Sequence, residues 1–281
     1  MKNISDLNAL NSANGVNLSS FAFMGVGSKK YKTGSHIDQS GVNLNAGIAK
    51  SFESNALGEI LGGAFIELGY AKYESSIANG FVSEGNTKFF GLGVMGQKDF
   101  ANDFYANLAL RIGKVMSDYE NTINLANYNI DYSALYYGAN LGGEKFVNLN
   151  SSNTLYIYAK YFFSHTNSDE IQTNGSNLKF DAVNAHQITL GAKDNIALDN
   201  KNQIYGGANV NYKFGGESKG RIEQGFVVFD IPSPSLKGTY FGLNAGFERA
   251  QSDNLNLSIG AKAYFGKEQG IGANLGVEYK F

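Results

Sequence analysis

The sequence predicts an all-β protein, a transmembrane antiparallel up-and-down barrel of about twelve strands. Three observations support this fold class. Apolar and polar residues alternate with a period of two along most of the chain, and helical periodicity is nearly absent. Short Asn/Asp/Ser turns alternate with longer polar connections, which is typical of membrane barrels. No apolar stretch approaches the ~20 residues that a membrane-spanning helix needs.

The individual strands follow from this alternation. The last segment is the clearest, because Ile271, Leu275, Val277, Tyr279 and Phe281 fall on one face and small or polar residues on the other. Similar segments are centred near residues 23, 45, 67, 93, 109, 140, 160, 188, 209, 244, 260 and 276. This spacing of roughly 22 residues leaves room for ~9–11 membrane-embedded residues per strand. Phe65 and Phe89 interrupt the polar face of their segments.

The connections divide into two classes. Short turns are expected at Ser54-Asn55, Ala101-Asn102, 150–153, 199–202 and 252–254, and longer polar stretches at 75–87, 120–131, 164–181 and 215–237. The structural alternative is a soluble β-sandwich, in which short and long connections are not expected to alternate. Within the last stretch, the apolar run Gly225–Phe229 suggests a hairpin above the barrel wall.

Composition excludes several functions. The 281 residues carry a net charge of −2, so nucleic acid is not an expected partner. There is no cysteine, hence no disulfide or thiolate metal site. No Gly-x-Ser-x-Gly motif, phosphate loop or metal-ligand spacing is present, and we expect no cofactor, no metal and no enzymatic activity. His36 near Asp38, and His165 near Asp169 and Glu170, are the weak enzymatic alternative.

If the apolar face meets lipid, the other face lines a lumen. Both charge signs occur there, so carboxylates and cations can pair across the interior. The residues predicted to line the lumen are Asn43, Asn45, Glu67, Arg111, Asn140, Glu144, Lys160, Gln187, Lys193, Asn209, Asn211, Asn244, Glu248, Lys262, Asn274 and Glu278.

The two ends of the chain carry a family resemblance. The segments 231–247 and 257–270, with a Gly-Lys-x-x-Gly hairpin at 266–270, lead into the terminal strand Val277–Phe281. Together they resemble the closing hairpins of the autotransporter (type V secretion) β-domain, and Thr33–Asp38 resembles its first hairpin. The resemblance covers residues 19–281 and rests on strand pattern alone in the middle.

The resemblance implies a translocator barrel in the bacterial outer membrane. Its implied partners are outer-membrane lipid, the barrel assembly machinery, and its own N-terminal passenger with a linker helix, the passenger being absent from this sequence. Residues 1–18 would then be the end of that linker, with Ile4, Leu7 and Leu10 on one helical face and Gly15 as a C-terminal cap, or else a frayed terminus. Residues 19–281 would be the barrel. Met1–Ile4 lacks the core of a signal peptide, so we expect an export signal upstream.

The C-terminal residues Leu275, Val277, Tyr279 and Phe281 resemble the signature that the assembly machinery recognises. Strand addition at an unpaired edge is the physical basis of such recognition. The alternative is that Phe281 is only an interfacial aromatic residue.

Two functions from different classes therefore compete most closely. The first is the translocator barrel, and the second is a general outer-membrane channel that narrows its pore with an inward-folded loop. The two predict different consequences of removing residues 1–18.

Overall fold

The computed structural model describes residues 18–33, 36–54, 58–76, 82–100, 102–123, 126–173, 176–217, 219–231 and 235–281. Over these ranges the chain is built of β-strands, and no helix there has the length and apolar character to cross a membrane. The strands are β1 (Leu18–Lys32), β2 (His36–Ser54), β3 (Gly58–Ser76), β4 (Val82–Phe100), β5 (Phe104–Ile123), β6 (Ala126–Asn148), β7 (Asn153–Thr166), β8 (Asp169–Thr173), β9 (Ser176–Phe180), β10 (Val183–Ala197), β11 (Asn202–Lys213), β12 (Gly220–Gln224), β13 (Val227–Ile231), β14 (Gly238–Ala250), β15 (Leu255–Gly266) and β16 (Glu268–Lys280).

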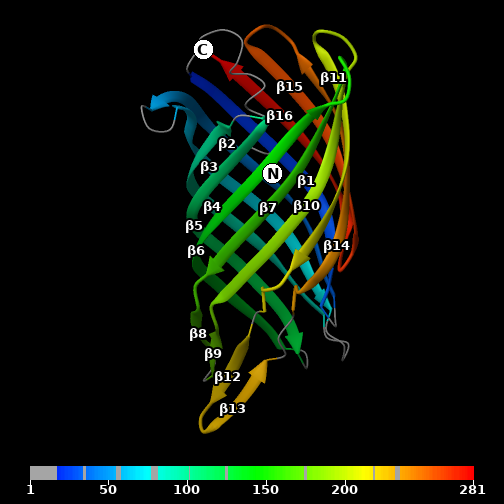
Figure 1. The fold of residues 1–281 in the computed structure, drawn as a ribbon. Coiled ribbons are helices and arrows are strands. Elements are labelled where there is room, and N and C mark those ends of the chain that lie inside the picture. Colours follow the sequence, from blue (N-terminus) through cyan, green and yellow to red (C-terminus); the bar gives the residue numbers. More distant parts are fainter. Residues whose placement is uncertain are drawn as a thin grey trace.

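Twelve of these strands close into a barrel in which every neighbour is antiparallel and, apart from the closing pair, follows in chain order (Figure 1). The barrel closes where β1 pairs with β16, from Ser19↔Lys280 to Tyr31↔Glu268. A closed barrel leaves no unpaired edge, which is the condition for strands to cross lipid. The predicted fold class and strand number are confirmed.

A second, four-stranded sheet has the order β13-β12-β9-β8 and projects beyond one end of the barrel (Figure 1). It is formed by the two longest connections, those between β7 and β10 and between β11 and β14. The apolar run at Gly225 is the turn of the β12–β13 hairpin, with Gly225 at φ 59°. The expected hairpin is confirmed. We call this end of the barrel the long-loop end and the opposite end the short-turn end.

At the short-turn end, compact turns join consecutive strands. Asn102 and Asp103 both have positive φ (66° and 58°), the left-handed pair that a tight hairpin turn requires and that Asn and Asp tolerate. Asp199 accepts hydrogen bonds from the backbone N–H groups of Lys201 and Asn202 at 2.7 and 2.8 Å. Asn55 and Ala101, which belong to two of the predicted turns, lie outside the described residues.

Two predicted long loops are wrong. The stretch 75–87 lies mostly in strands, because β3 runs to Ser76 and β4 begins at Val82. The polar stretch 120–131 is not a long connection, because β5 runs to Ile123 and β6 begins at Ala126. Antiparallel pairing satisfies the backbone hydrogen bonds whatever the side chains are. The polar residues here therefore lengthen the strands and do not form a loop. The stretches 164–181 and 215–237 contain the strands of the second sheet.

The alternation of the sequence becomes two faces of the wall. Large apolar side chains point outward, for example Leu92 and Ile271, which are 63% and 69% exposed in the isolated chain. Inward positions on the same strands are far less exposed: Gln97 on β4 is 3% exposed and Glu278 on β16 is 4% exposed. Such a continuous apolar outer surface is expected where lipid covers it.

Aromatic rings on the inner face lie over glycines of the neighbouring strand. Phe65 is paired with Gly93, and Phe89 with Gly69. A Cβ at either glycine would collide with the ring of its partner. The same arrangement recurs at Tyr136 over Gly113, Tyr158 over Gly191, Tyr205 over Gly246 and Phe23 over Gly276. These inner glycines therefore make room for the aromatic rings of the neighbouring strand.

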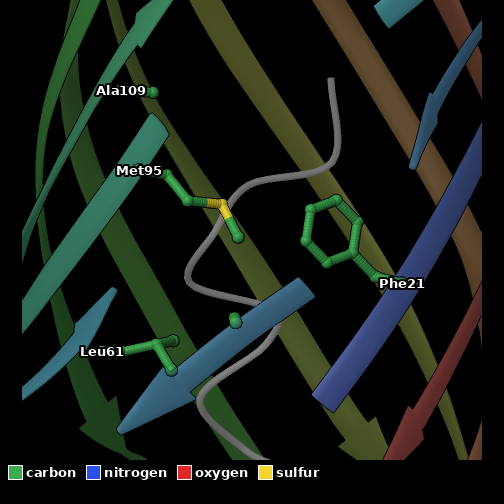
Figure 2. Close-up of a cluster of buried hydrophobic side chains, with 5 residues drawn as sticks. Phe21, Leu61, Met95 and Ala109 are labelled. Atoms are coloured by element: carbon green, nitrogen blue, oxygen red, sulfur yellow. The ribbon is translucent and has the colours of Figure 1, made fainter. Parts of the chain in front are cut away.

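An apolar cluster lies inside the barrel. Phe21, Leu61 and Met95 converge from β1, β3 and β4, with Ala109 on β5 beside Met95 (Figure 2). Ala49 completes the cluster, and Phe23 and Phe65 pack against it. The rule that apolar residues face lipid is wrong at these positions, because the side chains bury one another instead. We call this part of the inner surface, on β1–β5, the apolar wall.

Candidate functional site: the barrel lumen

Two adjoining cavities of about 410 and 220 Å³ occupy the interior. The first borders the apolar wall and also meets polar residues of β2, β15 and β16. The second lies against β7, β10, β11 and β14. The predicted lumen residues that line one or both cavities are Asn43, Asn45, Asn140, Glu144, Lys160, Gln187, Lys193, Asn209, Asn211, Asn244, Lys262 and Asn274.

The remaining predicted lumen residues are placed elsewhere on the inner surface. Glu67 and Arg111 form an ion pair at 3.5 Å. Glu248 accepts a hydrogen bond from Gln203 at 2.6 Å, and Glu278 is buried on β16 near the short-turn end.

Charges inside the barrel are paired across strands. Besides Arg111, Glu67 has Tyr136 as a partner, whose hydroxyl donates to it at 2.6 Å. Glu144 lies 3.7 Å from Lys160 in a second buried pair. A charge removed from water needs such partners, because an isolated one costs several kcal/mol. Glu67 and Glu144 are therefore each paired with a cation of another strand.

A hydrogen-bonded network covers the wall opposite the apolar one. Thr189 donates to Asn211 at 2.7 Å, and Asn211 donates to Asn209 at 2.6 Å. Gln187 accepts from the Tyr240 hydroxyl at 3.1 Å. The network links β10, β11 and β14, and it contributes neutral polar groups to the second cavity, which is also lined by Glu144, Lys160, Lys193 and Lys262.

A charged cluster at the long-loop end of the lumen was missed by the sequence analysis. Glu268 is 1% exposed, pairs with Lys29 at 3.2 Å, and also pairs with Lys213. Tyr264 packs beneath Lys29, with 4.3 Å from the ammonium to the ring centre. Because β11, β16 and β1 are not all neighbours, the cluster ties separated parts of the wall together. We call it the mouth cluster.

A signal for the mouth cluster was present in the sequence. Glu268 continues the period-two positions of Asn274 and Glu278 on β16, and Lys213 continues those of Asn209 and Asn211 on β11. Both residues lie at strand ends: Lys213 comes just before the predicted loop 215–237, and Glu268 falls within the predicted hairpin 266–270.

The three histidines have separate partners. His36 lies 3.4 Å from Asp38 on an exposed part of β2. His165 contacts Asn184 and Asn167, while Asp169 and Glu170 have other partners. His186 lies on the outer face of β10 and has a partner that the sequence did not reveal, the Tyr161 hydroxyl at 2.7 Å. No group of three or more metal-ligating side chains occurs within the described ranges.

The C-terminal residues lie on the outer face at the short-turn end. Leu275, Val277, Tyr279 and Phe281 are all exposed, and the rings of Tyr279 and Phe281 pack edge to face. The Phe281 N–H donates to the Leu18 carbonyl at 3.1 Å, so the last residue is held against the first strand.

Comparison with known proteins agrees with this geometry. The family described as "Autotransporter beta-domain" matches residues 21–262. The chain belongs to the autotransporter β-domain family. It is therefore an outer-membrane translocator barrel, and the family's known members act in transport and not as enzymes. No curated protein matches this β-domain.

Solved structures with the same fold include three autotransporter domains. The β-domain of the Bordetella autotransporter BrkA superposes with a TM-score of 0.70 at 18% identity, over 94% of this chain and 100% of that one. The translocator domain of NalP from Neisseria meningitidis gives 0.73 at 15% identity, over 99% and 92%. The transport unit of AIDA-I from Escherichia coli gives 0.73 at 16% identity, over 97% and 92%.

Proposed function

We propose that this β-domain exports an N-terminal passenger through its lumen and then holds the linker of that passenger inside the barrel. The observation that carries the proposal is the two-sided interior, with the apolar wall on β1–β5 and the polar network on β10, β11 and β14. An amphipathic segment can satisfy both sides at once. A channel for small polar solutes has no use for an apolar wall.

The proposed occupant is the segment 1–17, which precedes β1. Ile4, Leu7 and Leu10 would meet the apolar wall, and the asparagines and serines between them would face the polar side. Residues 1–17 lie outside the described residues, so this placement rests on the sequence pattern and on the surface that the barrel offers.

Two measurements test the proposal. Residues 1–281 expressed behind a signal peptide should enter the outer-membrane fraction and show a gel mobility that changes on boiling. Removal of residues 1–17 should raise the single-channel conductance of the purified barrel in a planar bilayer. Unchanged conductance would instead favour the general channel.

A reporter fused before residue 1 separates the two functions further. Exposure of the reporter at the cell surface, measured by its sensitivity to added protease in intact cells, is expected of a translocator. A channel would leave the reporter in the periplasm, although the barrel itself would still be folded.

We infer further partners from the outer surface. Lipid would cover the apolar outer band, with the short-turn end in the periplasm and the long-loop end outside the cell. The exposed row Leu275, Val277, Tyr279 and Phe281 would be read by the assembly machinery before β16 pairs with β1. The projecting β12–β13 hairpin, with Phe226 at its tip, would contact the emerging passenger.

A further inference from the structure

Three lysines lie next to one another on the outer face near the long-loop end. They are Lys72 on β3, Lys88 on β4 and Lys114 on β5. Lys88 pairs with Tyr70, two residues before Lys72, and Lys114 pairs with Phe90, two residues after Lys88. Diagonal neighbours on one face of an antiparallel pair are ~7–8 Å apart, within reach of long side chains. We call these residues the lysine row.

The lysine row follows the rim of the barrel. Lys88 and Lys114 are each displaced by two residues toward the short-turn end relative to the preceding lysine. Strand ends are displaced in the same direction. Leu18, the first residue of β1, pairs with Lys50, but β2 continues past Lys50 toward the short-turn end as far as Ser54. Tilted strands produce this offset. The three ammonium groups therefore lie at similar depth in the membrane.

The row borders the apolar band directly. Phe90 and Leu92 follow Lys88 on the outer face of β4 and are 48% and 63% exposed. Leu68 on β3 and Ile112 on β5 continue the band beneath Lys72 and Lys114. This is the depth at which lipid headgroups meet a membrane barrel.

The charges around the row favour an anion that arrives from the membrane side. Over the described ranges, no carboxylate lies within ion-pair distance of Lys72, Lys88 or Lys114. Glu74, Glu84 and Asp118 lie further out on the same strands, so an anion in solution meets these carboxylates first. A phosphate carried by a lipid reaches the lysines without passing them.

Nearby cations complete the surroundings of the row. Lys30 on β1 lies on the same side of the barrel but is paired with Asp38 at 3.4 Å. His36 also contacts Asp38. Lys30 and His36 would have to leave Asp38 to join the lysine row. The proposed site therefore contains only the three lysines of the row.

The row is confined to one sector of the barrel. At the same end, the outward residues of β6, β7, β10 and β11 are mainly apolar or aromatic: Leu135, Tyr137, Phe163, His186 and Phe214. Lysines that only anchor a barrel in its interface would be distributed around the rim. Concentration on three adjacent strands is what a binding site requires.

We propose that the lysine row binds the phosphate groups of a phosphorylated glycolipid in the outer leaflet. The acyl chains lie along the apolar band beside Phe90, and the phosphates contact Lys72, Lys88 and Lys114. The inference rests on the membrane orientation given under the proposed function.

The test uses the full chain with diphosphoryl lipid A, dephosphorylated lipid A and inorganic phosphate as probes. The measured quantity is the temperature at which the folded gel band is lost, at increasing probe concentration. The variant is Lys72→Gln, Lys88→Gln, Lys114→Gln. The matched control, Lys50→Gln, Lys98→Gln, Lys145→Gln, removes three outward lysines from the short-turn end.

Diphosphoryl lipid A should stabilise the wild type and the control, and the variant should need at least tenfold more of it, since each lysine near an anionic surface contributes ~1 kcal/mol. The other two probes should have little effect. Equal responses of the variant and the control would overturn the proposal, as would equal stabilisation by inorganic phosphate. Wild type without any heat-dependent shift would overturn the membrane barrel itself, which is a separate failure.

Discussion

At Gly93, a single hydrogen in place of a side chain lets the Phe65 ring lie flat against the neighbouring strand. A Cβ there would overlap ring atoms, and the ring has little space to retreat into because it packs against the apolar wall. We expect Gly93→Ala to lower the free energy of unfolding by about 1–3 kcal/mol, the usual cost of overpacking. Urea unfolding of the barrel in detergent micelles measures this.

Gly206 provides the matched control for that substitution. It lies on a barrel strand as well, but nothing is within 4 Å of the Cβ that alanine would add. Gly206→Ala should therefore change the unfolding free energy by no more than about 0.5 kcal/mol. Equal effects of the two substitutions would show that the ring-over-glycine contact does not constrain the wall.

At the scale of single residues, the face of the wall could be predicted from the sequence for some side chains but not for others. The side of the wall for Glu67 or Asn209 follows from period two alone, because the pleat leaves only two faces. Phe21 and Met95 break the simple rule, since their inward placement depends on partners from other strands. Period two places a side chain on a face, but it cannot say what that side chain meets across the lumen.

Among the elements, the connection between β11 and β14 carries an ion pair between residues near its two ends, close to the barrel. Glu217 and Lys237 lie 2.6 Å apart, and the pKa of Glu217 is lowered by the hydrogen bond and the charge of Lys237. A lowered pKa means that the stabilisation is complete above the ordinary value of 4.5 and is lost as the pH falls through the lower folded value.

We therefore expect the connection to become more sensitive to an acid-active protease only when the pH falls well below 4.5. Glu217→Gln should be cleaved faster at neutral pH and should lose most of this pH dependence. Asp253→Asn, an exposed carboxylate in a turn at the other end, is the control. Cleavage rates of Glu217→Gln that match the wild type at every pH would contradict the role of the pair.

The end of β16 supports a second prediction at this scale. Deleting Phe281 removes the hydrogen bond to Leu18 and the last exposed ring of the outer row. We expect less folded barrel in the outer membrane and more unfolded chain degraded in the periplasm. Phe281→Trp should restore assembly if an aromatic ring is what matters. A normal yield from the deletion would refute the proposed signal.

Strand positions could be predicted from the sequence more reliably than strand ends. The centres agree because alternation persists through the membrane, where the outer face must be apolar. Beyond the membrane that demand disappears, so β5 and β6 continue through the polar residues 120–131 without any hydrophobic pattern. The second sheet could be anticipated only at its apolar β12–β13 turn, for the same reason.

For the whole molecule, the mouth cluster holds β1, β11 and β16 together at the long-loop end of the lumen. Neutralising Glu268 would leave Lys29 and Lys213 near each other without their shared carboxylate, and they would repel. We expect Glu268→Gln to raise the conductance of a barrel that lacks residues 1–17.

Glu53→Gln, an exposed carboxylate at the short-turn end, removes the same charge from the molecule without touching the mouth cluster. Its conductance should equal that of the unmutated barrel. If Glu268→Gln behaves in the same way in a planar bilayer, the cluster does not limit the passage.

The pairing of β1 with β16 makes the fold a ring with no intrinsic first strand. Residues at the two ends of the barrel sequence meet along the seam from Ser19↔Lys280 to Tyr31↔Glu268. A circular permutation, with a peptide joining Phe281 to Leu18 and a new opening at the 251–254 turn, would therefore preserve every ladder but would remove the proposed C-terminal signal. Under the proposed function, the seam lies where it does because export requires the barrel to begin where the passenger ends.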